Sequence, residues 1–237
     1  MLKIINYSKT YSNGKRAVNN LNIEVLPGDL MAFIGANGAG KTTTIKSIVG
    51  ILPFENGDIL INGTSIKKDP ITCKSQLAYI PDNPDLYDSI TGIQYLNLVA
   101  DIFKLSKEKR MEKITYFASK FELMDNLNDL ISSYSHGMKQ KLALISAFMH
   151  DPKLLILDEP FVGLDPKSTF IVKQQMKEMC ENGSSIFFST HILEVAEKLC
   201  NKIAIIKKGE LVISGATDDI IKESSLEDVF LELTDNA

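Results

Sequence analysis

The fold is decided by residues 30–42, which read LMAFIGANGAGKT. Leu30–Ile34 is a short apolar run typical of a buried strand, and residues 41–52 carry apolar side chains at helical spacing, with Pro53 as the expected stop. Between them, residues 35–42 match the pattern G-x-x-x-x-G-K-[ST]. Because this loop lies between a predicted strand and a predicted helix, the match indicates a phosphate-binding loop rather than a glycine-rich structural turn.

The residues of this loop supply the groups that a nucleotide's phosphates need. Glycines let the backbone pass close to the phosphates, so that successive N–H groups point at oxygen atoms, and the following helix adds its positive N-terminal end. We expect Lys41 to reach the β- and γ-phosphates and the Thr42 hydroxyl to bind Mg²⁺. The predicted phosphate contacts are Gly35, Asn37, Gly38, Ala39, Gly40, Lys41, Thr42 and Thr43.

The loop pattern alone does not separate ATP from GTP. Proteins that read guanine usually carry N-K-x-D, and the nearest string here, Asn201 to Ala204, reads NKIA and lacks the aspartate. The sequence therefore gives no support for guanine recognition.

A second apolar run, residues 154–157, ends in two adjacent carboxylates, Asp158 and Glu159. Ligands of α/β sheets bind at the carboxyl ends of the strands, so Asp158 is placed to hold Mg²⁺ through its water shell. Glu159 points elsewhere and is a candidate to polarise an attacking water molecule. A solvated turn is the alternative, and the upstream phosphate loop disfavours it.

The string Tyr134-Ser135-His136-Gly137-Met138 precedes an apolar helix predicted over residues 142–149. A serine followed by a glycine at a helix start makes a good anion site, because the hydroxyl, the free N–H groups and the helix dipole face the same way. Taken alone, the string is more typical of an ordinary helix cap.

Length and composition limit the protein classes that fit. The chain has 237 residues, enough for one large domain or two small ones, and a net charge of −4, which argues against a general nucleic-acid binder. Uncharged stretches such as residues 89–100 are too short to span a bilayer, and residues 1–16 contain no apolar block like that of a signal peptide. The three cysteines form no CxxC pair, as expected of a protein in a reducing compartment.

Periodicity divides the chain into regions of different character. Residues 2–5 and 21–25 read as short strands with a turn at Asn13-Gly14 between them, and residues 91–150 read as mostly helical. Strands and helices alternate after that, which predicts a parallel α/β core. At the end, Leu226 begins an apolar stripe at helical spacing, which we expect to pack on the chain's own core or on a second subunit.

The order of these motifs, followed by Gly163-Leu164-Asp165 and by His191, resembles the ATP-binding subunit of ABC transporters over nearly the whole chain. The resemblance implies a P-loop NTPase: a RecA-like α/β core with an antiparallel β subdomain and a helical subdomain. It also implies ATP hydrolysis by two subunits that meet head to tail. The expected regions are 1–88 (β-rich start and phosphate-loop core), 89–150 (helical subdomain), 151–216 (second half of the core) and 217–237 (helical tail) of a single ATP-binding domain.

The resemblance also assigns roles to single residues. Tyr11 looks like the aromatic ring that stacks on adenine, and Asp165 like the residue that links the two sites across the dimer. His191 looks like the histidine that touches the γ-phosphate, and with Lys41 and Glu159 it completes the expected catalytic set. Ser135 and Gly137 look like the pair that faces the phosphates of the other subunit's ATP.

Two segments depart from the usual family pattern. The signature segment usually reads L-S-G-G-Q, whereas His136 and Met138 replace a glycine and the glutamine here. Asp82 stands where the family usually has a glutamine that contacts Mg²⁺ or its water and senses the membrane partner. Both variants, and the ending 225–231, look similar to the subgroup that works with ABC-2-type membrane subunits, mostly exporters.

The resemblance implies a peripheral protein on the cytosolic face of the cell membrane, bound to a membrane-spanning subunit and to a second ATP-binding subunit, identical or different. An alternative is a soluble ATPase of the same type that acts on a non-membrane partner. Such proteins usually carry a long coiled-coil insert or two such domains, and the residues between Gly40 and Ser135 leave no room for a long coiled coil. A regulatory module without turnover is disfavoured by the intact Lys41, Asp158, Glu159 and His191.

Overall fold

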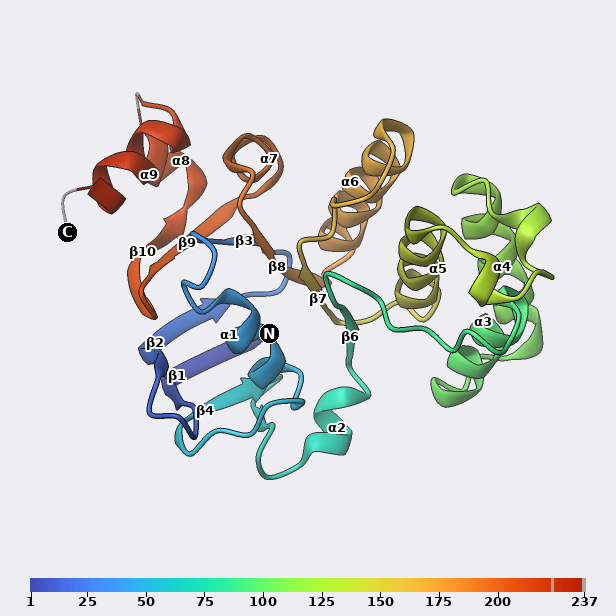
Figure 1. Cartoon of the computed structure of the whole chain (residues 1–237), viewed down its shortest axis with the longest axis horizontal. Coiled ribbons are helices and arrows are strands. Elements are labelled where there is room, and N and C mark those ends of the chain that lie inside the picture. Colours follow the sequence, from blue (N-terminus) through green and yellow to red (C-terminus); the bar gives the residue numbers. More distant parts are fainter. Residues whose placement is uncertain (223, 236–237) are drawn as a thin grey trace. The chain divides into compact units, whose positions relative to one another are not determined.

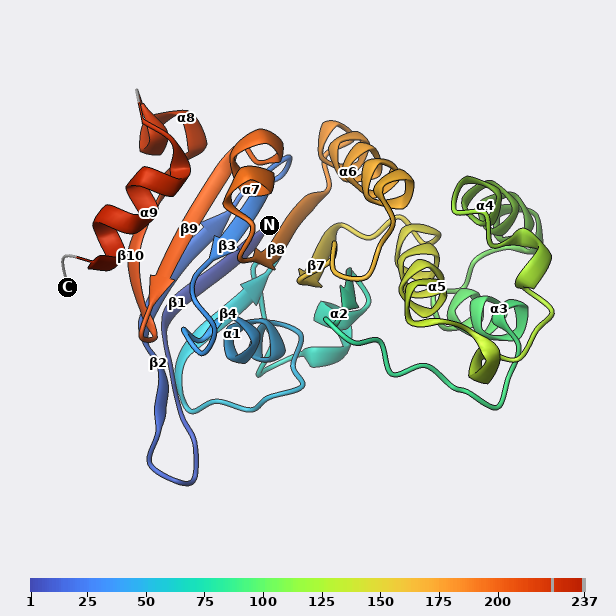
Figure 2. The same cartoon turned by 45° about the horizontal axis from the view of Figure 1, so that its top comes forward.

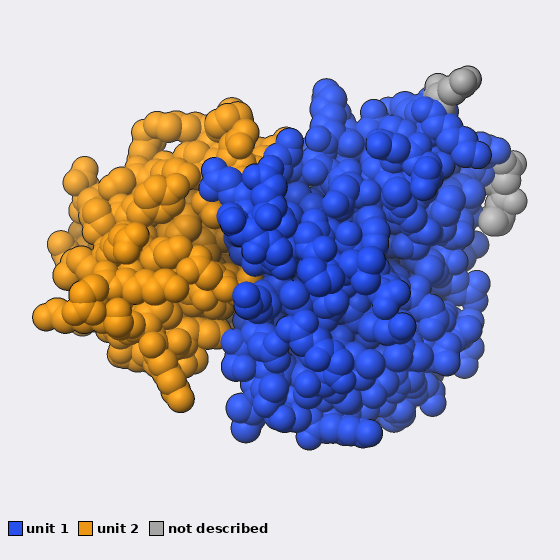
Figure 3. Space-filling view, turned by 180° about the vertical axis from the view of Figure 1, so that it is seen from behind, with its two compact units in different colours: residues 1–79, 153–160, 176–237 blue, residues 80–152, 161–175 orange. Residues whose placement is uncertain are grey.

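The computed structural model describes residues 1–222 and 224–235 and divides into two compact units (Figure 3). Unit 1 comprises Met1–Tyr79, Lys153–Pro160 and the described residues from Met176 onward, and unit 2 comprises Ile80–Pro152 and Phe161–Gln175. The tail expected over residues 217–237 includes residues 223, 236 and 237, which lie outside the described residues.

The smaller sheet of unit 1 is antiparallel, in the order β2-β1-β4-β5. Its strands are β1 (Leu2–Thr10), β2 (Arg16–Val25), β4 (Asn56–Ile61) and β5 (Thr64–Ser65). The turn predicted at Asn13-Gly14 is present, and β1 and β2 are longer than the segments predicted from alternation. Asn6 and Asn20 have φ of 47° and 50°. These irregularities shift the register of the pair and break the two-residue period, so the sequence revealed only part of each strand.

The larger sheet has the order β10-β9-β3-β8-β7-β6, and β9, β3, β8 and β7 are mutually parallel. Its strands are β3 (Leu30–Ile34), β6 (Leu77–Ile80), β7 (Leu154–Asp158), β8 (Ser185–Thr190), β9 (Lys202–Lys207) and β10 (Glu210–Ala216). The parallel α/β core that the sequence predicts is therefore confirmed. Every residue of β3, β7 and β8 is buried, which explains why these strands read as continuous apolar runs.

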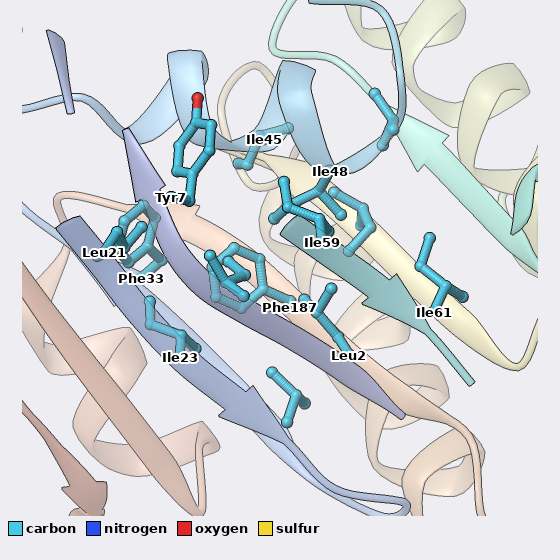
Figure 4. Close-up of a cluster of buried hydrophobic side chains, with 14 of the residues drawn as sticks. Leu2, Tyr7, Leu21, Ile23, Phe33, Ile45, Ile48, Ile59, Ile61 and Phe187 are labelled. Atoms are coloured by element: carbon cyan, nitrogen blue, oxygen red, sulfur yellow. The ribbon is translucent and has the colours of Figure 1, made fainter. Parts of the chain in front are cut away.

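One hydrophobic cluster joins the two sheets of unit 1 to the helix that follows the phosphate loop (Figure 4). Leu2 and Tyr7 come from β1, Phe33 from β3, Phe187 from β8 and Ile45 from α1, and all five are almost fully buried. The rings of Phe33 and Phe187 are 5.2 Å apart, between neighbouring strands. The cluster thereby fixes the strand before the phosphate loop and the helix after it.

The helix after the loop is shorter than predicted. α1 runs from Lys41 to Ile48 and not to residue 52, so the prediction that Pro53 would end it is wrong. Gly50 adopts a φ of +68°, and the N–H groups of Ile51 and Leu52 turn back to the carbonyl of Lys46. A glycine in the left-handed region ends the helix first, because it lets the chain bond the last free carbonyls. α2 (Pro70–Lys74) follows later in unit 1, with the Asp69 carboxylate capping its N-terminus.

The helices predicted between residues 91 and 150 are present and pack together in unit 2. α3 (Gly92–Ile102), α4 (Lys107–Lys120) and α5 (His136–Phe148) lie side by side in both views (Figures 1 and 2). Two short 3₁₀ turns, η1 (Met124–Asn126) and η2 (Ile131–Ser133), connect α4 to α5. Side-chain hydroxyls of Thr91, Ser106 and Ser135 cap the three helices, so local sequence defines where each begins.

The remaining helices are α6 (Pro166–Glu181), which continues from unit 2 into unit 1, α7 (Leu193–Leu199), α8 (Thr217–Ile221) and α9 (Leu226–Asp235). α9 packs on α7 and α8, and Leu226 is fully buried while Val229, Phe230 and Leu233 are half-buried. The predicted apolar stripe therefore faces this chain's own unit 1. Over the described ranges, none of the helices has both the length and the apolar character needed to cross a bilayer.

Candidate nucleotide-binding site

Three parallel strands of unit 1 end together at one edge of the larger sheet. Ile34 of β3 is paired with Thr190 of β8, and Ser189 of β8 is paired with Asp158 of β7. The phosphate loop, His191 and Glu159 each follow one of these strand ends directly. The sheet register therefore brings together three motifs that lie far apart in the sequence.

The phosphate loop has a backbone that requires glycine at two positions. Gly40, the residue before α1, has a φ of 112°, and a Cβ added there would lie 2.7 Å from the carbonyl oxygen of Ala17. A Cβ on Gly35 would lie 2.5 Å from the carbonyl oxygen of Ile206. The backbones of β2 and β9 therefore pack closely against the loop, and this packing fixes the path of the loop into the N-terminus of α1.

Lys41 is buried, with its side-chain ammonium held inside the curve of the loop. Its Nζ donates to the carbonyl oxygen of Gly35 at 2.6 Å and lies 3.4 Å from that of Ala36. The same nitrogen lies 3.8 Å from Glu159 Oε1. The ammonium therefore lies beside the backbone of the phosphate loop.

The two carboxylates after β7 have different surroundings. Asp158 is 3% exposed and accepts a hydrogen bond from the Ser189 hydroxyl, with 2.5 Å between Asp158 Oδ1 and Ser189 Oγ. Glu159 is half-buried, and its own N–H donates to the same Ser189 oxygen at 3.1 Å. Its φ of 48° lies in the left-handed region, which turns the chain sharply after the strand. Sequence reasoning did not single out Ser189.

His191 and Tyr11 complete the set of predicted residues in unit 1. His191 is exposed, and its Nδ1 lies 3.0 Å from Glu159 Oε2, a hydrogen-bond distance at which the ring N–H donates to the carboxylate. Glu159 thus has Lys41 near one oxygen and His191 near the other. Tyr11 is 38% exposed, and its hydroxyl lies 3.1 Å from Thr43 Oγ1 in the first turn of α1. An exposed ring beside the phosphate loop is available for stacking on a base.

Tyr7 contacts α1 one turn further along the same face. Its hydroxyl lies 2.7 Å from Ser47 Oγ, and burial raises the pKa of this tyrosine to about 12, so it stays a neutral hydrogen-bonding group. The contact links β1 to the middle of α1 and holds the helix whose N-terminus faces the loop.

Four predicted site residues, Asp82, Ser135, Gly137 and Asp165, belong to unit 2. Ser135 is exposed and accepts a hydrogen bond from the N–H of Met138 at 3.3 Å, so it is the N-cap of the 13-residue helix α5. A Cβ on Gly137 would lie 3.0 Å from the carbonyl oxygen of Gly163, so these two segments of unit 2 touch. Asp82 is exposed in the loop that follows β6.

Asp165 is tied to its own unit by contacts that the sequence did not reveal. Lys141 of α5 lies 2.8 Å from its Oδ2, and Ser168 donates to it from both N–H and hydroxyl at 2.8 Å. The Lys141 contact, followed by the two Ser168 hydrogen bonds, holds the pKa of Asp165 well below its usual range. The carboxylate therefore stays charged, caps the start of α6 and links it to α5.

The polar groups at this edge of unit 1 fit a nucleoside triphosphate with a magnesium ion. The loop offers backbone N–H groups, the ammonium of Lys41 and the N-terminus of α1 to the phosphates. One carboxylate, Asp158, and one hydroxyl, Thr42, match the few protein ligands that Mg²⁺ takes when phosphates and water supply the others. Residues 1–222 and 224–235 contain no cluster of three or more His, Cys, Asp or Glu side chains that could hold a metal ion by itself. A magnesium site completed by phosphates and water does not need such a cluster.

Comparison with known proteins agrees with this assignment. The ABC transporter family model matches residues 18–162, and a second model, described as an AAA domain of a putative AbiEii toxin of type IV toxin–antitoxin systems, matches residues 130–197. The chain is 36% identical over 222 residues to the ABC-type transporter ATP-binding protein EcsA of Bacillus subtilis (strain 168), and the match covers 92% of this chain and 90% of EcsA.

Solved structures give the same result. A structure described as the ATP-binding subunit of an ABC transporter superposes with a TM-score of 0.95 at 36% identity, covering 99% of both chains. The cbiO1 protein of Clostridium perfringens, described as part of the ABC transporter complex cbiONQ, superposes with a TM-score of 0.78 at 25% identity, covering 94% of this chain and 90% of cbiO1.

A phosphate loop between β3 and α1, next to an acidic strand end on β7, defines a P-loop ATPase with a RecA-like core and an antiparallel β subdomain. More narrowly, the chain belongs to the ABC transporter family, among its ATP-binding proteins.

Proposed function

We propose that this chain binds ATP with Mg²⁺ and hydrolyses it to power a membrane transporter. The observation that carries the proposal is the meeting of three motifs around one carboxylate: Glu159 lies 3.8 Å from Lys41 Nζ and 3.0 Å from His191 Nδ1. A carboxylate held between a phosphate-binding lysine and a histidine is suited to act on a water molecule next to a terminal phosphate.

In this proposal each residue of the site has its own role. The loop N–H groups and Lys41 bind and orient the β- and γ-phosphates, and Tyr11 stacks on the base. Asp158 and Thr42 would hold Mg²⁺, with Asp82 as a further contact through water, and the bound ion would supply positive charge next to the phosphates. Glu159 accepts a proton from the attacking water or orients it, and His191 contacts the γ-phosphate. When phosphates engage Lys41, its attraction for Glu159 weakens, which frees the carboxylate for that step.

The second half of the proposal concerns partners. Ser135 and Gly137 at the N-terminus of α5 form an anion site that, in a head-to-tail dimer, meets the ATP of the other subunit, with Asp165 at the junction. The name of EcsA as a transporter ATP-binding protein and the place of cbiO1 in a transporter complex support a membrane-spanning partner for this chain. We place the protein on the cytosolic face of the membrane.

We propose export as the direction of transport. The support is the pair of sequence variants, Asp82 and the Ser135-His136-Gly137 segment, which resemble those of ATP-binding subunits that work with ABC-2-type membrane subunits. The exposed Asp82 lies in a loop with Pro81 and Pro84, and it would couple metal occupancy to the membrane partner.

Two measurements test the proposal. Purified protein should release phosphate from ATP in the presence of Mg²⁺ and not in EDTA, and tagged protein recovered from gently solubilised membranes should carry a polytopic membrane protein identified by mass spectrometry. Adding that protein in vesicles should raise the hydrolysis rate. Recovery with a non-membrane partner that stimulates hydrolysis instead would overturn the transporter role, and absence of hydrolysis in both settings would overturn the ATPase role.

A further inference from the structure

Ser189 is a polar residue of β8, a fully buried strand in the larger sheet. Its exposed fraction is 0%, and it stands opposite Asp158 in the register of β8 and β7. Its hydroxyl touches both acidic positions: Oγ lies 2.5 Å from Asp158 Oδ1 and 3.1 Å from the backbone nitrogen of Glu159. Neither the family pattern used above nor the proposed mechanism gives this side chain a role.

We infer that Ser189 is a positioning residue of the nucleotide site, which orients the metal-binding carboxylate and the catalytic glutamate through a single hydroxyl group. The inference rests on the proposed function, because it assigns Ser189 a task only if Asp158 holds Mg²⁺ and Glu159 acts on water.

The direction of the two hydrogen bonds is fixed by chemistry. A carboxylate only accepts and an N–H only donates, so the one proton of the hydroxyl points to Asp158 and an oxygen lone pair receives the Glu159 N–H. The hydroxyl therefore occupies Oδ1 and leaves Oδ2 of Asp158 for a metal or its water. Because the bond is short and charge-assisted, it restrains the rotation of the carboxylate.

The second bond acts on the turn that carries Glu159. This residue adopts a φ of 48°, a left-handed conformation that a side chain with a Cβ disfavours. The N–H bond to Ser189 helps to hold that turn. Without it, the backbone can relax to an ordinary conformation, and the Glu159 carboxylate leaves its place between Lys41 and His191.

Removing the hydroxyl should therefore damage metal binding and turnover together. Partners that orient metal ligands commonly change metal affinity or activity by about 10- to 100-fold when they are lost. The change should spare nucleotide binding without metal, since the phosphate loop and Tyr11 make no contact that runs through Ser189.

The chain offers a matched control on the same strand. Ser185 is also 0% exposed, and its hydroxyl donates to the carbonyl oxygen of Leu26 at 2.7 Å, at the opposite end of β8. Ser185→Ala removes one buried hydroxyl from the same strand without touching an acidic residue. Ser189→Thr keeps the hydroxyl on a side chain that suits a strand and should restore function. Ser189→Cys, nearly the same size with a weaker donor, carries the test if Ser189→Ala does not fold.

The experiment measures metal binding apart from hydrolysis. Each variant is saturated with the non-hydrolysable analogue AMP-PNP and titrated with Mn²⁺, with bound ion followed by electron paramagnetic resonance. AMP-PNP affinity is also measured in EDTA, and turnover is measured at saturating Mg²⁺ATP. We expect Ser189→Ala to weaken Mn²⁺ binding and to lower kcat, each by about tenfold or more, with unchanged affinity in EDTA. Ser189→Cys should be intermediate, and Ser185→Ala and Ser189→Thr should resemble the wild type.

If Ser189→Ala and Ser185→Ala both keep the Mn²⁺ affinity and kcat of the wild type, the inference is overturned. The proposed function would stay intact, because the wild type still hydrolyses ATP. Equal losses in Ser189→Ala and Ser185→Ala would also overturn the inference, since they would show a merely structural role. A wild type that shows no metal-dependent hydrolysis would overturn the proposed function and this inference with it.

Discussion

We expect His150 to make the free energy of unfolding depend on pH. Its ring stacks on Phe103, with 3.6 Å between ring centroids and an angle of 6° between the planes. Burial lowers the pKa of His150 to about 4 from 6.5, and the neighbouring Asp151 opposes the shift only in part. The histidine is therefore neutral in the folded protein at pH values where it is charged in the unfolded chain.

The sign and size of the effect follow from proton linkage. Because the pKa is lowered in the folded state, the unfolded chain binds the extra proton first, and acid favours unfolding. The contribution of His150 is fully present above pH 6.5 and is lost as the pH falls from 6.5 to about 4. Each unit of pKa shift is worth about 1.4 kcal/mol, so the loss between pH 7 and pH 5 comes to about 2 kcal/mol.

The substitution His150→Phe isolates this contribution. Phenylalanine keeps a flat apolar ring against Phe103 and has no proton to gain, so its stability should fall less between pH 7 and pH 5. Urea unfolding followed by circular dichroism at both pH values gives the free energy of unfolding for each protein. We expect the wild type to lose about 2 kcal/mol more than His150→Phe over this interval.

The comparison cancels other acid effects, including that of Asp151, whose carboxylate binds Lys109 and Lys113 in both proteins. Equal pH dependence of the two proteins would refute the reasoning, since it would mean that His150 is not held neutral by burial.

Three further changes test the site and the tail. Lys41→Ala should weaken ATP binding by roughly 2–5 kcal/mol, measured by calorimetric titration; the exposed Lys46→Ala on the same helix is the control, and equal affinities would exclude the phosphate role. Tyr11→Ala should weaken ATP and GTP alike by about 1–3 kcal/mol, and Tyr11→Phe should be mild because the ring does the stacking; a silent alanine variant would make this tyrosine structural. Leu226→Ala should lower stability by about 2–4 kcal/mol without changing how the ATPase rate depends on protein concentration, whereas a normal thermal melt with a shifted dependence would assign the α9 stripe to the dimer.

Much of the fold was predictable because its signals are local. β3 coincides with the apolar run before the phosphate loop, and α3, α4 and α5 lie in the region whose spacing predicts helices. The prediction for the end of α1 is wrong because the sequence has two residues there that can end a helix. Gly50, in a left-handed conformation, ends the helix before Pro53 is reached. The long strands β1 and β2 were seen in part because asparagines in left-handed conformations interrupt their alternation.

The residues of the candidate site also differ in whether the local sequence reveals them. The loop, Asp158 and Glu159 stand in local sequence patterns that predict their roles, whereas the role of His191 is implied by the family resemblance. The sequence did not reveal Ser189 or the Lys141 partner of Asp165, because their roles arise from strand and helix pairing over long sequence distances. A signal for Ser189 exists, namely a hydroxyl inside a buried apolar strand two residues before His191, but it gains meaning only once β8 is placed beside β7.

The central claim is that Glu159 acts on the water that attacks ATP, and the substitution Glu159→Gln tests it most directly. Glutamine keeps the size of the side chain and removes its charge, so hydrolysis should fall by about 10²- to 10⁴-fold while ATP still binds. Because the bridging ATP is no longer consumed, light scattering should then show a dimer that persists in ATP. A Glu159→Gln variant that releases phosphate at the wild-type rate would contradict the account.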